Sequence, residues 1–168
     1  GPRGNEHFDP PEPRVLKDGK TVLISTFFCG LYRVKDIESR APSIEWVYSF
    51  DFNDKYDCAI PVVNGDYWIQ AVGSKTAIVS LNVSNPSKPT KAFELKFNTG
   101  EWPHWIALEP GGNRLVVTGN NRLKNTLLIV DVDKKTGKMS FDRSFRDKRT
   151  GKLGFSFDRF DWPHGNTD

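Results

Sequence analysis

The feature that most constrains how this chain can fold is an internal repeat. Residues Tyr56–Gly73 align without a gap on Trp102–Gly119, which lie 46 residues later in the sequence. In this alignment Gly73 matches Gly119, and a looser copy, Arg14–Thr26, lies about one period earlier. Repeats of roughly 40–50 residues occur in proteins that stack one supersecondary unit against the next. The chain should therefore be built from three related units.

Each unit has the pattern of strands rather than of helices. Its apolar runs are short, rich in Val, Ile, Leu and Thr, and bounded by Gly, Pro, Asn and Asp, as expected for antiparallel hairpins. A helical repeat would instead space its apolar residues every three to four positions. Four consecutive strands form one blade of a β-propeller. We therefore predict an all-β fold of about three four-stranded antiparallel blades in an incomplete ring, with no helix longer than two turns within 14–146.

The predicted blades divide the chain as follows: an N-terminal arm at 1–13, blade one at 14–50, blade two at 51–97, blade three at 98–146, and a connection with the start of a further blade at 147–168. The phrase Glu101–His104, which opens the innermost strand of blade three, returns near the end as Asp161–His164. Closed propellers need roughly four to eight blades, and unpaired strand edges invite association. We expect a fragment of a longer propeller or, less favoured, part of a ring completed by further copies of the chain. Its partners would then be other blades or other copies.

Blades two and three resemble those of a known family. Trp102–Gly119, followed by Leu128–Lys138, looks like a blade of the lactonase-like propellers, in which Pro-His and an apolar strand precede Ser-Pro-Asp-Gly and Tyr-Val-Thr-Asn. Ala77–Pro89 is similar to a related repeat that contains Val-Asp-Val-Ser-Asn-Pro. The selenium-binding proteins, which include methanethiol oxidases, share such blades more distantly. Glu109–Gly112 departs from the usual Ser-Pro-Asp-Gly, so the resemblance implies the fold but not a specific activity.

Composition narrows the function classes. The net charge is only +3, and the single basic run, Arg143–Lys152, also contains Asp147. Nucleic-acid binding would need a more concentrated basic face, and no run approaches the roughly 18 apolar residues of a membrane span. We predict a soluble chain with neither partner; the compartment stays open, with secreted and periplasmic locations among the alternatives. Two cysteines are too few for a disulfide scaffold, so Cys29 and Cys58 are expected to be buried free thiols.

The histidines are the candidate metal ligands. His7, His104 and His164 lie near the expected entrances of innermost strands, which in a propeller surround the central channel. Imidazoles brought together there could bind a divalent metal such as copper or zinc, or iron. Cys58 aligns with His104 and could add a thiolate. The alternative, which the sequence favours, is that Trp-Pro-His is a packing element with no metal.

Two further sets of polar residues have a functional and a structural interpretation. A lactonase-like hydrolase would use carboxylates and a cation at the channel mouth, for which Glu101, Arg159 and Asp161 are candidates. The acidic loop Asp51–Asp57 resembles the start of a calcium loop but lacks its glycine and closing Glu. Both sets are more simply explained as solvated loop charges. Because no catalytic set is complete, the leading hypothesis is a binding platform for a protein or a small ligand; the alternative is a lactonase-like hydrolase or a copper-dependent oxidase.

Overall fold

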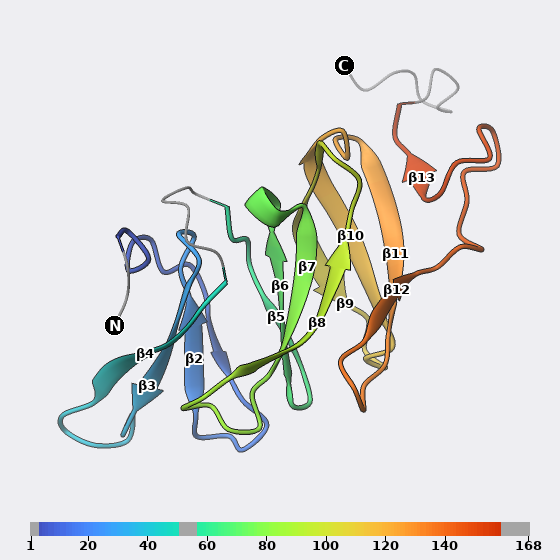
Figure 1. The fold of residues 1–168 in the computed structure, drawn as a ribbon. Coiled ribbons are helices and arrows are strands. Elements are labelled where there is room, and N and C mark those ends of the chain that lie inside the picture. The colour runs from blue at the N-terminus through green and yellow to red at the C-terminus, as the bar shows by residue number, and fades with distance from the viewer. Residues whose placement is uncertain (1–3, 51–56, 159–168) are drawn as a thin grey trace, which may run out of the picture.

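Three antiparallel sheets, each made of strands consecutive in sequence, form the body of the molecule (Figure 1). The computed structural model describes residues 4–50 and 57–158. Blade one contains β1 (Pro13–Val15), β2 (Val22–Ser25), β3 (Gly30–Lys35) and β4 (Ser43–Ser49); blade two contains β5 (Val62–Asn64), β6 (Tyr67–Val72), β7 (Ala77–Asn82) and β8 (Thr90–Lys96); blade three contains β9 (Glu101–Leu108), β10 (Arg114–Asn121), β11 (Thr126–Val132) and β12 (Met139–Phe141).

The predicted all-β fold class is confirmed. Within the described ranges the one helical element is the single 3₁₀ turn η1 (Gly73–Lys75), in the hairpin between β6 and β7. That part of the chain therefore contains no helix of a length that could cross a membrane. Connections of two to seven residues join the successive strands within each blade. The shortest, between β5 and β6, contains Gly65, whose positive φ a residue with a side chain would rarely adopt.

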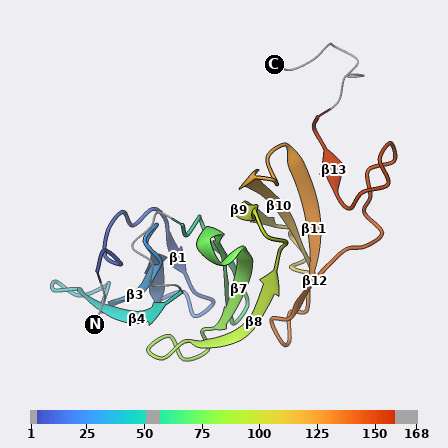
Figure 2. The same ribbon diagram turned by 45° about the horizontal axis from the view of Figure 1, so that its top comes forward.

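Blade two is the centre of the structure because both of its faces are covered. The three sheets lie side by side in a fan, with β5–β8 between the other two (Figures 1 and 2). Neighbouring residues of a strand point to opposite faces of its sheet. Trp68 of β6 accordingly packs with Leu23 and Leu31 of blade one, whereas Ile69 packs with Leu115 and Val130 of blade three. Every residue of β6 is buried.

The outermost strand of blade three is interrupted by an excursion. After β12 the chain leaves the sheet over residues 142–154 and returns as β13 (Phe155–Ser156), which pairs with β11 beside β12. The buried carboxylate of Asp147 holds the excursion together by accepting N–H groups of Arg149, Thr150 and Ser156. The start of the connection expected at 147–168 is therefore a hairpin that leads back to the same blade. The repeated phrase at 161–164 lies outside the described residues.

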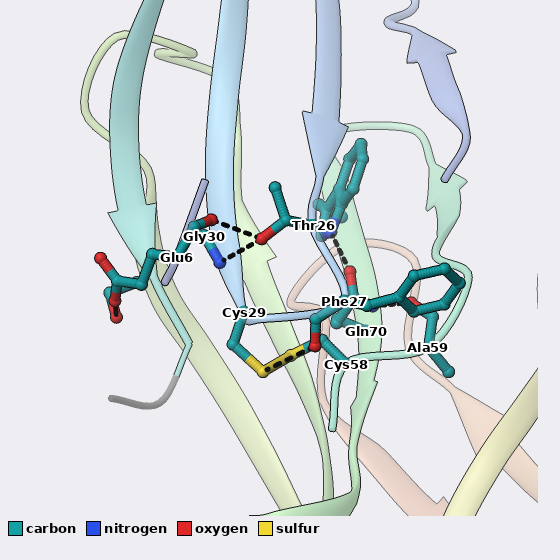
Figure 3. Close-up of a disulfide and its surroundings, with 10 residues drawn as sticks. Glu6, Thr26, Phe27, Cys29, Gly30, Cys58, Ala59 and Gln70 are labelled. Atoms are coloured by element: carbon teal, nitrogen blue, oxygen red, sulfur yellow. Dashed lines mark hydrogen bonds between the residues drawn. A yellow bond between two sulfur atoms is a disulfide. The ribbon is translucent and has the colours of Figure 1, made fainter. Parts of the chain in front are cut away.

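The expectation that the cysteines are free thiols is wrong. Cys29, in the turn between β2 and β3, forms a disulfide with Cys58 at the start of blade two, with a Cα–Cα distance of 5.1 Å (Figure 3). The carbonyl of Phe27 accepts the N–H groups of Asp57 and Cys58, both at 3.0 Å, and so brings the two segments together. Both cysteines are buried. A count of two cysteines cannot reveal a pairing that depends on where two blades meet.

The described part of the N-terminal arm before β1, residues 4–12, packs against blade one without forming a helix or a strand. Glu6 is only 2% exposed: its carbonyl accepts the hydroxyl of Thr26 at 2.6 Å, and its carboxylate accepts the hydroxyl of Ser49. Gly30 lies directly below, where a Cβ would overlap the Glu6 carbonyl (Figure 3). The arm thus anchors the end of blade one at which the disulfide lies.

Candidate functional site

The described residues do not gather the predicted metal ligands. No group of three or more His, Cys, Asp or Glu side chains suited to a metal occurs within 4–50 and 57–158. His7 is exposed on the arm, and its ring contacts Phe8 at a tilt of 58°, whereas His104 lies in β9 of blade three. His164 and the acidic loop 51–56 are outside the described residues. The assignment of the histidines to a metal therefore remains a prediction.

The tentative thiolate role of Cys58 needs correction. Thiolates bind metals, and the sulfur of Cys58 is instead bonded to that of Cys29. Cys58 and His104 occupy equivalent positions in two successive blades, but the side chains have different roles there. In blade two this position holds the link to blade one. In blade three it holds a half-buried imidazole.

His104 has the surroundings of a packed side chain. Its ring contacts Trp105 edge to face, with centroids 4.4 Å apart. Burial lowers the pKa of His104 below its ordinary value of 6.5, because an apolar environment disfavours the charged imidazolium. Its Nδ1 is buried and has no hydrogen-bond partner in the described structure. Within the described residues the imidazole therefore keeps one nitrogen without a partner, which suits a packed side chain and equally a metal ligand.

The rest of the Trp-Pro-His phrase connects blade three to blade two. The indole of Trp102 lies over Gly73 in η1, where a Cβ would overlap the ring. The carbonyl of Trp102 also lies close to Gly119 in β10, beside the bulge at Thr118/Gly119, where a Cβ would overlap the carbonyl oxygen. The two glycines that match in the repeat therefore both make room for one tryptophan. Close packing against Trp102 therefore explains why both positions are glycine.

The residues proposed for lactone hydrolysis do not form a visible set. The carboxylate of Glu101 accepts the backbone N–H and the side-chain amide of Asn98 at 2.9 and 3.0 Å, in an exposed turn that begins β9. Arg159 and Asp161 lie outside the described residues. The interpretation of Glu101 as a loop charge with a local structural role is therefore the one that its contacts support.

A cleft that the sequence did not predict opens beside the sheet of blade three, among the connection before β9, the hairpin between β10 and β11, and the excursion. We call it the excursion cleft; it has a volume of about 810 Å³, and its lining includes Asn98, Arg122, Lys124, Leu128, Phe141, Arg143, Arg149 and Lys152. Its apolar floor continues the core between blades two and three, since Leu128 is buried in that core and Phe141 packs against Phe97 with ring centroids 5.0 Å apart. The signal available in the sequence was the basic run Arg143–Lys152, which supplies one wall.

Both outer faces of the fan carry exposed apolar residues. On blade three, the strand register places Trp105 and Ala107 on one face with Val116 and Ile129. On blade one, it places Val15, Val34 and Ile44 on the face turned away from blade two. Trp105, Val15 and Ile44 are 50%, 59% and 66% exposed. We refer to these as the open face of blade three and the open face of blade one.

Comparison with known proteins identifies the architecture. No protein family and no curated protein matches the sequence. Among solved structures, the chain is similar to a protein assigned as a 6-phosphogluconolactonase from Bacteroides fragilis (17% identity, TM-score 0.63, 80% of this chain and 38% of that one). It is also similar to a hypothetical selenium-binding protein from Sulfolobus tokodaii (13%, 0.65, 91% and 43%) and to the β-propeller domain of Cps50 (Swd1) from Myceliophteria thermophila (14%, 0.54, 77% and 43%).

At these identities the similarity establishes the fold alone. The chain spans about two fifths of the length of each of these three proteins. Its three blades, their strand order and their stacking are those of a β-propeller segment, as the repeat predicted.

Proposed function

We propose that the chain is a segment of a propeller that acts as a binding platform, and that its two open faces are covered by further blades of the same kind. The observation that carries this proposal is the contrast between the blades. Blade two is buried on both faces, whereas blades one and three each bury one apolar face and leave the other uncovered. Exposed apolar faces of this kind are typical of interfaces.

The lengths of the similar structures support further blades as the occupants. Three blades correspond to 38–43% of those chains, so a ring of the same size would contain blades beyond both open faces. An opposing four-stranded blade offers an apolar face of matching width, as blade two does to each of its neighbours. Further copies of the chain could supply such blades in place of a longer polypeptide.

The association state of the chain tests this proposal. We expect the 168-residue chain to self-associate in light scattering, because no described residue buries Trp105, Val15 or Ile44 on its open faces. Replacing Ile44 and Trp105 together by Lys should shift it to a monomer without loss of folding. The control is Ile37→Lys, which changes an apolar side chain of similar exposure (48%) in the turn between β3 and β4. A wild-type chain that stays monomeric at all concentrations would overturn the proposal.

The second candidate function is enzymatic, and the similarity to a protein assigned as a lactonase and to a selenium-binding protein favours it. In that case the platform would carry a reaction at the channel mouth, near His104. Lactone hydrolysis by metal-free protein would support a hydrolase. Stoichiometric copper or zinc that is lost in His104→Ala would support a metal-dependent oxidase. If both results are negative, the platform without catalysis is left.

The disulfide supports a location in an oxidising compartment. Structural disulfides persist in secreted and periplasmic proteins and are rare in the cytosol. Cys29 and Cys58 are buried, join two blades and leave no free cysteine in the chain. Mass spectrometry of protein isolated under thiol-blocking conditions from its natural source would test this: thiols blocked at both positions would contradict it.

A further inference from the structure

We propose that the excursion cleft binds a small organic anion, in which a carboxylate, phosphate or sulfate group is attached to an apolar body. The inference rests on the platform proposal and deepens it, because it gives the platform a ligand site of defined chemistry. The site lies beside the sheet of blade three, on the face that carries Leu128, and not on either of the open faces. Further blades packed on those faces would therefore leave it accessible.

The shape of the cleft suits a small molecule. Ligand pockets typically enclose about 300–1,000 Å³ and have apolar walls with a few polar groups; the cleft has a volume of about 810 Å³. Leu123, Leu128, Phe141 and Leu153 supply its apolar part, and each belongs to the core between blades two and three or packs against it. The floor is consequently a continuation of a packed core rather than a loose loop surface.

The charges around this floor are mainly positive. Five cationic side chains line the cleft: Arg122, Lys124, Arg143, Arg149 and Lys152. Three carboxylates face them, Glu101, Asp147 and Asp158, so the formal balance is five minus three, or +2. None of the five cations forms an ion pair within the described residues.

The three carboxylates are occupied by other donors. Asp147 is 4% exposed and accepts three backbone N–H groups of its own loop, which also lower the pKa of its carboxyl. Glu101 accepts both donors of Asn98, and Asp158 accepts the side-chain amide of Asn125 at 2.8 Å. Cations on the strands, by contrast, do form ion pairs: Arg33 and Lys96, for example, each contact a glutamate at 2.7 Å. The positive charge of the cleft is therefore left for a ligand.

Two of the arginines are held in place by neutral groups. Arg122 donates from Nη1 to the carbonyl of Thr99 at 2.9 Å, and its side chain lies over Gly100 in the connection between β8 and β9. Arg149 donates from Nη2 to the carbonyl of Asp158 at 2.9 Å. A carbonyl fixes the orientation of a guanidinium without cancelling its charge. Guanidinium groups with donors to spare are well suited to bidentate binding of carboxylates and phosphates.

The test uses phenyl phosphate as the probe, because it combines a dianion with one aromatic ring. Phenyl phosphate is titrated into isotopically labelled protein, and the changes in NMR amide chemical shifts report both its affinity and the position of its binding site. We expect saturable binding with shifts at Arg122–Leu128 and Phe141–Leu153. Inorganic phosphate and phenol, each carrying half of the probe, should bind more weakly. Phenol binding as tightly as phenyl phosphate, or no saturable binding of phenyl phosphate, would overturn the proposal.

Charge-reversal variants distinguish binding at a specific site from general electrostatic attraction to a positively charged protein. Arg143→Glu with Arg149→Glu should weaken phenyl phosphate binding about tenfold or more, since two charge-assisted contacts are lost. The matched control is Arg40→Glu with Lys88→Glu, which changes the net charge equally at two exposed turn positions outside the lining of the cleft. Equal weakening in both variants would contradict a defined site.

A third variant keeps the proposal testable if the excursion does not tolerate charge reversal. Lys124→Glu changes an exposed residue of the hairpin between β10 and β11, on the opposite wall. It should weaken binding severalfold, and unchanged affinity would count against the site. Light scattering of the same variants should show the association of the wild type. Failure of anion binding and failure of blade docking are thus measured separately.

Discussion

The interface between blades one and two is held by a covalent bond and polar contacts, whereas the interface between blades two and three is held mainly by close packing. The first contains the disulfide, two hydrogen bonds from Arg14 to the carbonyl of Pro61 at 3.0 and 3.2 Å, and an ion pair of 2.5 Å between Lys17 and Asp66. The second contains Trp102 seated on Gly73 and a wide apolar core.

Strand length explains the difference. β1 and β2 of blade one have three and four residues, whereas β9 and β10 of blade three have eight each. Short strands present fewer apolar side chains to a neighbour, and burial of apolar area is the main source of stability. Only three partly buried hydrophobic residues pack around the core between blades one and two, whereas eight do so between blades two and three. The disulfide thus reinforces the smaller interface.

The largest expected effect comes from removal of this covalent bond. A cross-link between residues 29 positions apart stabilises a fold by about 3–4 kcal/mol through the lost entropy of the unfolded chain. Reduction, or Cys29→Ala with Cys58→Ala, should lower the free energy of unfolding by this amount in urea. The double variant is its own control, because reductant should no longer affect it. A loss below about 1 kcal/mol would mean that both interfaces depend on packing.

The packed interface should be most sensitive at Gly73. A Cβ at this position would overlap the Trp102 indole, so Gly73→Ala must displace a large side chain from the junction of blades two and three. Overpacking of this kind costs about 1–3 kcal/mol, measurable by urea unfolding. Gly111→Ala is a suitable control, since there the methyl group would meet only the flexible carboxylate of Glu109 and the side chain of Asn113. Equal losses in both variants would contradict the special role of Gly73.

The sequence was sufficient to predict the architecture, but it could not predict the features that depend on contacts between distant segments of the folded chain. Alternating apolar residues and turn glycines are local signals, and they predicted all four strands of each blade. β13 is two residues long and leaves no such signal. The disulfide requires the turn at Cys29 to meet the start of blade two, and the cleft requires Arg122 and Arg143 to meet across a blade. Both are properties of the folded chain rather than of any one segment.

Single hydrogen bonds across the packed interface should have smaller effects. Tyr67 of β6 donates its hydroxyl to the carbonyl of Lys135 at 2.7 Å, and so links blade two to the hairpin between β11 and β12. Tyr67→Phe removes this bond and keeps the ring, and should cost about 1 kcal/mol in chemical unfolding. Tyr48→Phe in β4, a half-buried tyrosine on blade one, is the comparison and should cost less. The opposite order would show that polar contacts matter more on the blade-one side.

The smallest effect is the pH dependence that His104 adds to blade three. Burial lowers its pKa in the folded protein, whereas the unfolded chain has the ordinary value of about 6.5. Below pH 6.5 the unfolded chain therefore binds more protons than the folded one, and stability falls as the pH falls. Above that value the contribution is constant. We expect chemical unfolding between about pH 7.5 and 5.5, one unit on either side of that value, to show this decline in the wild type and a flatter profile in His104→Gln. Identical slopes would mean that His104 exchanges protons as freely in β9 as in the unfolded chain, and that blade three packs around it more loosely than its buried Nδ1 indicates.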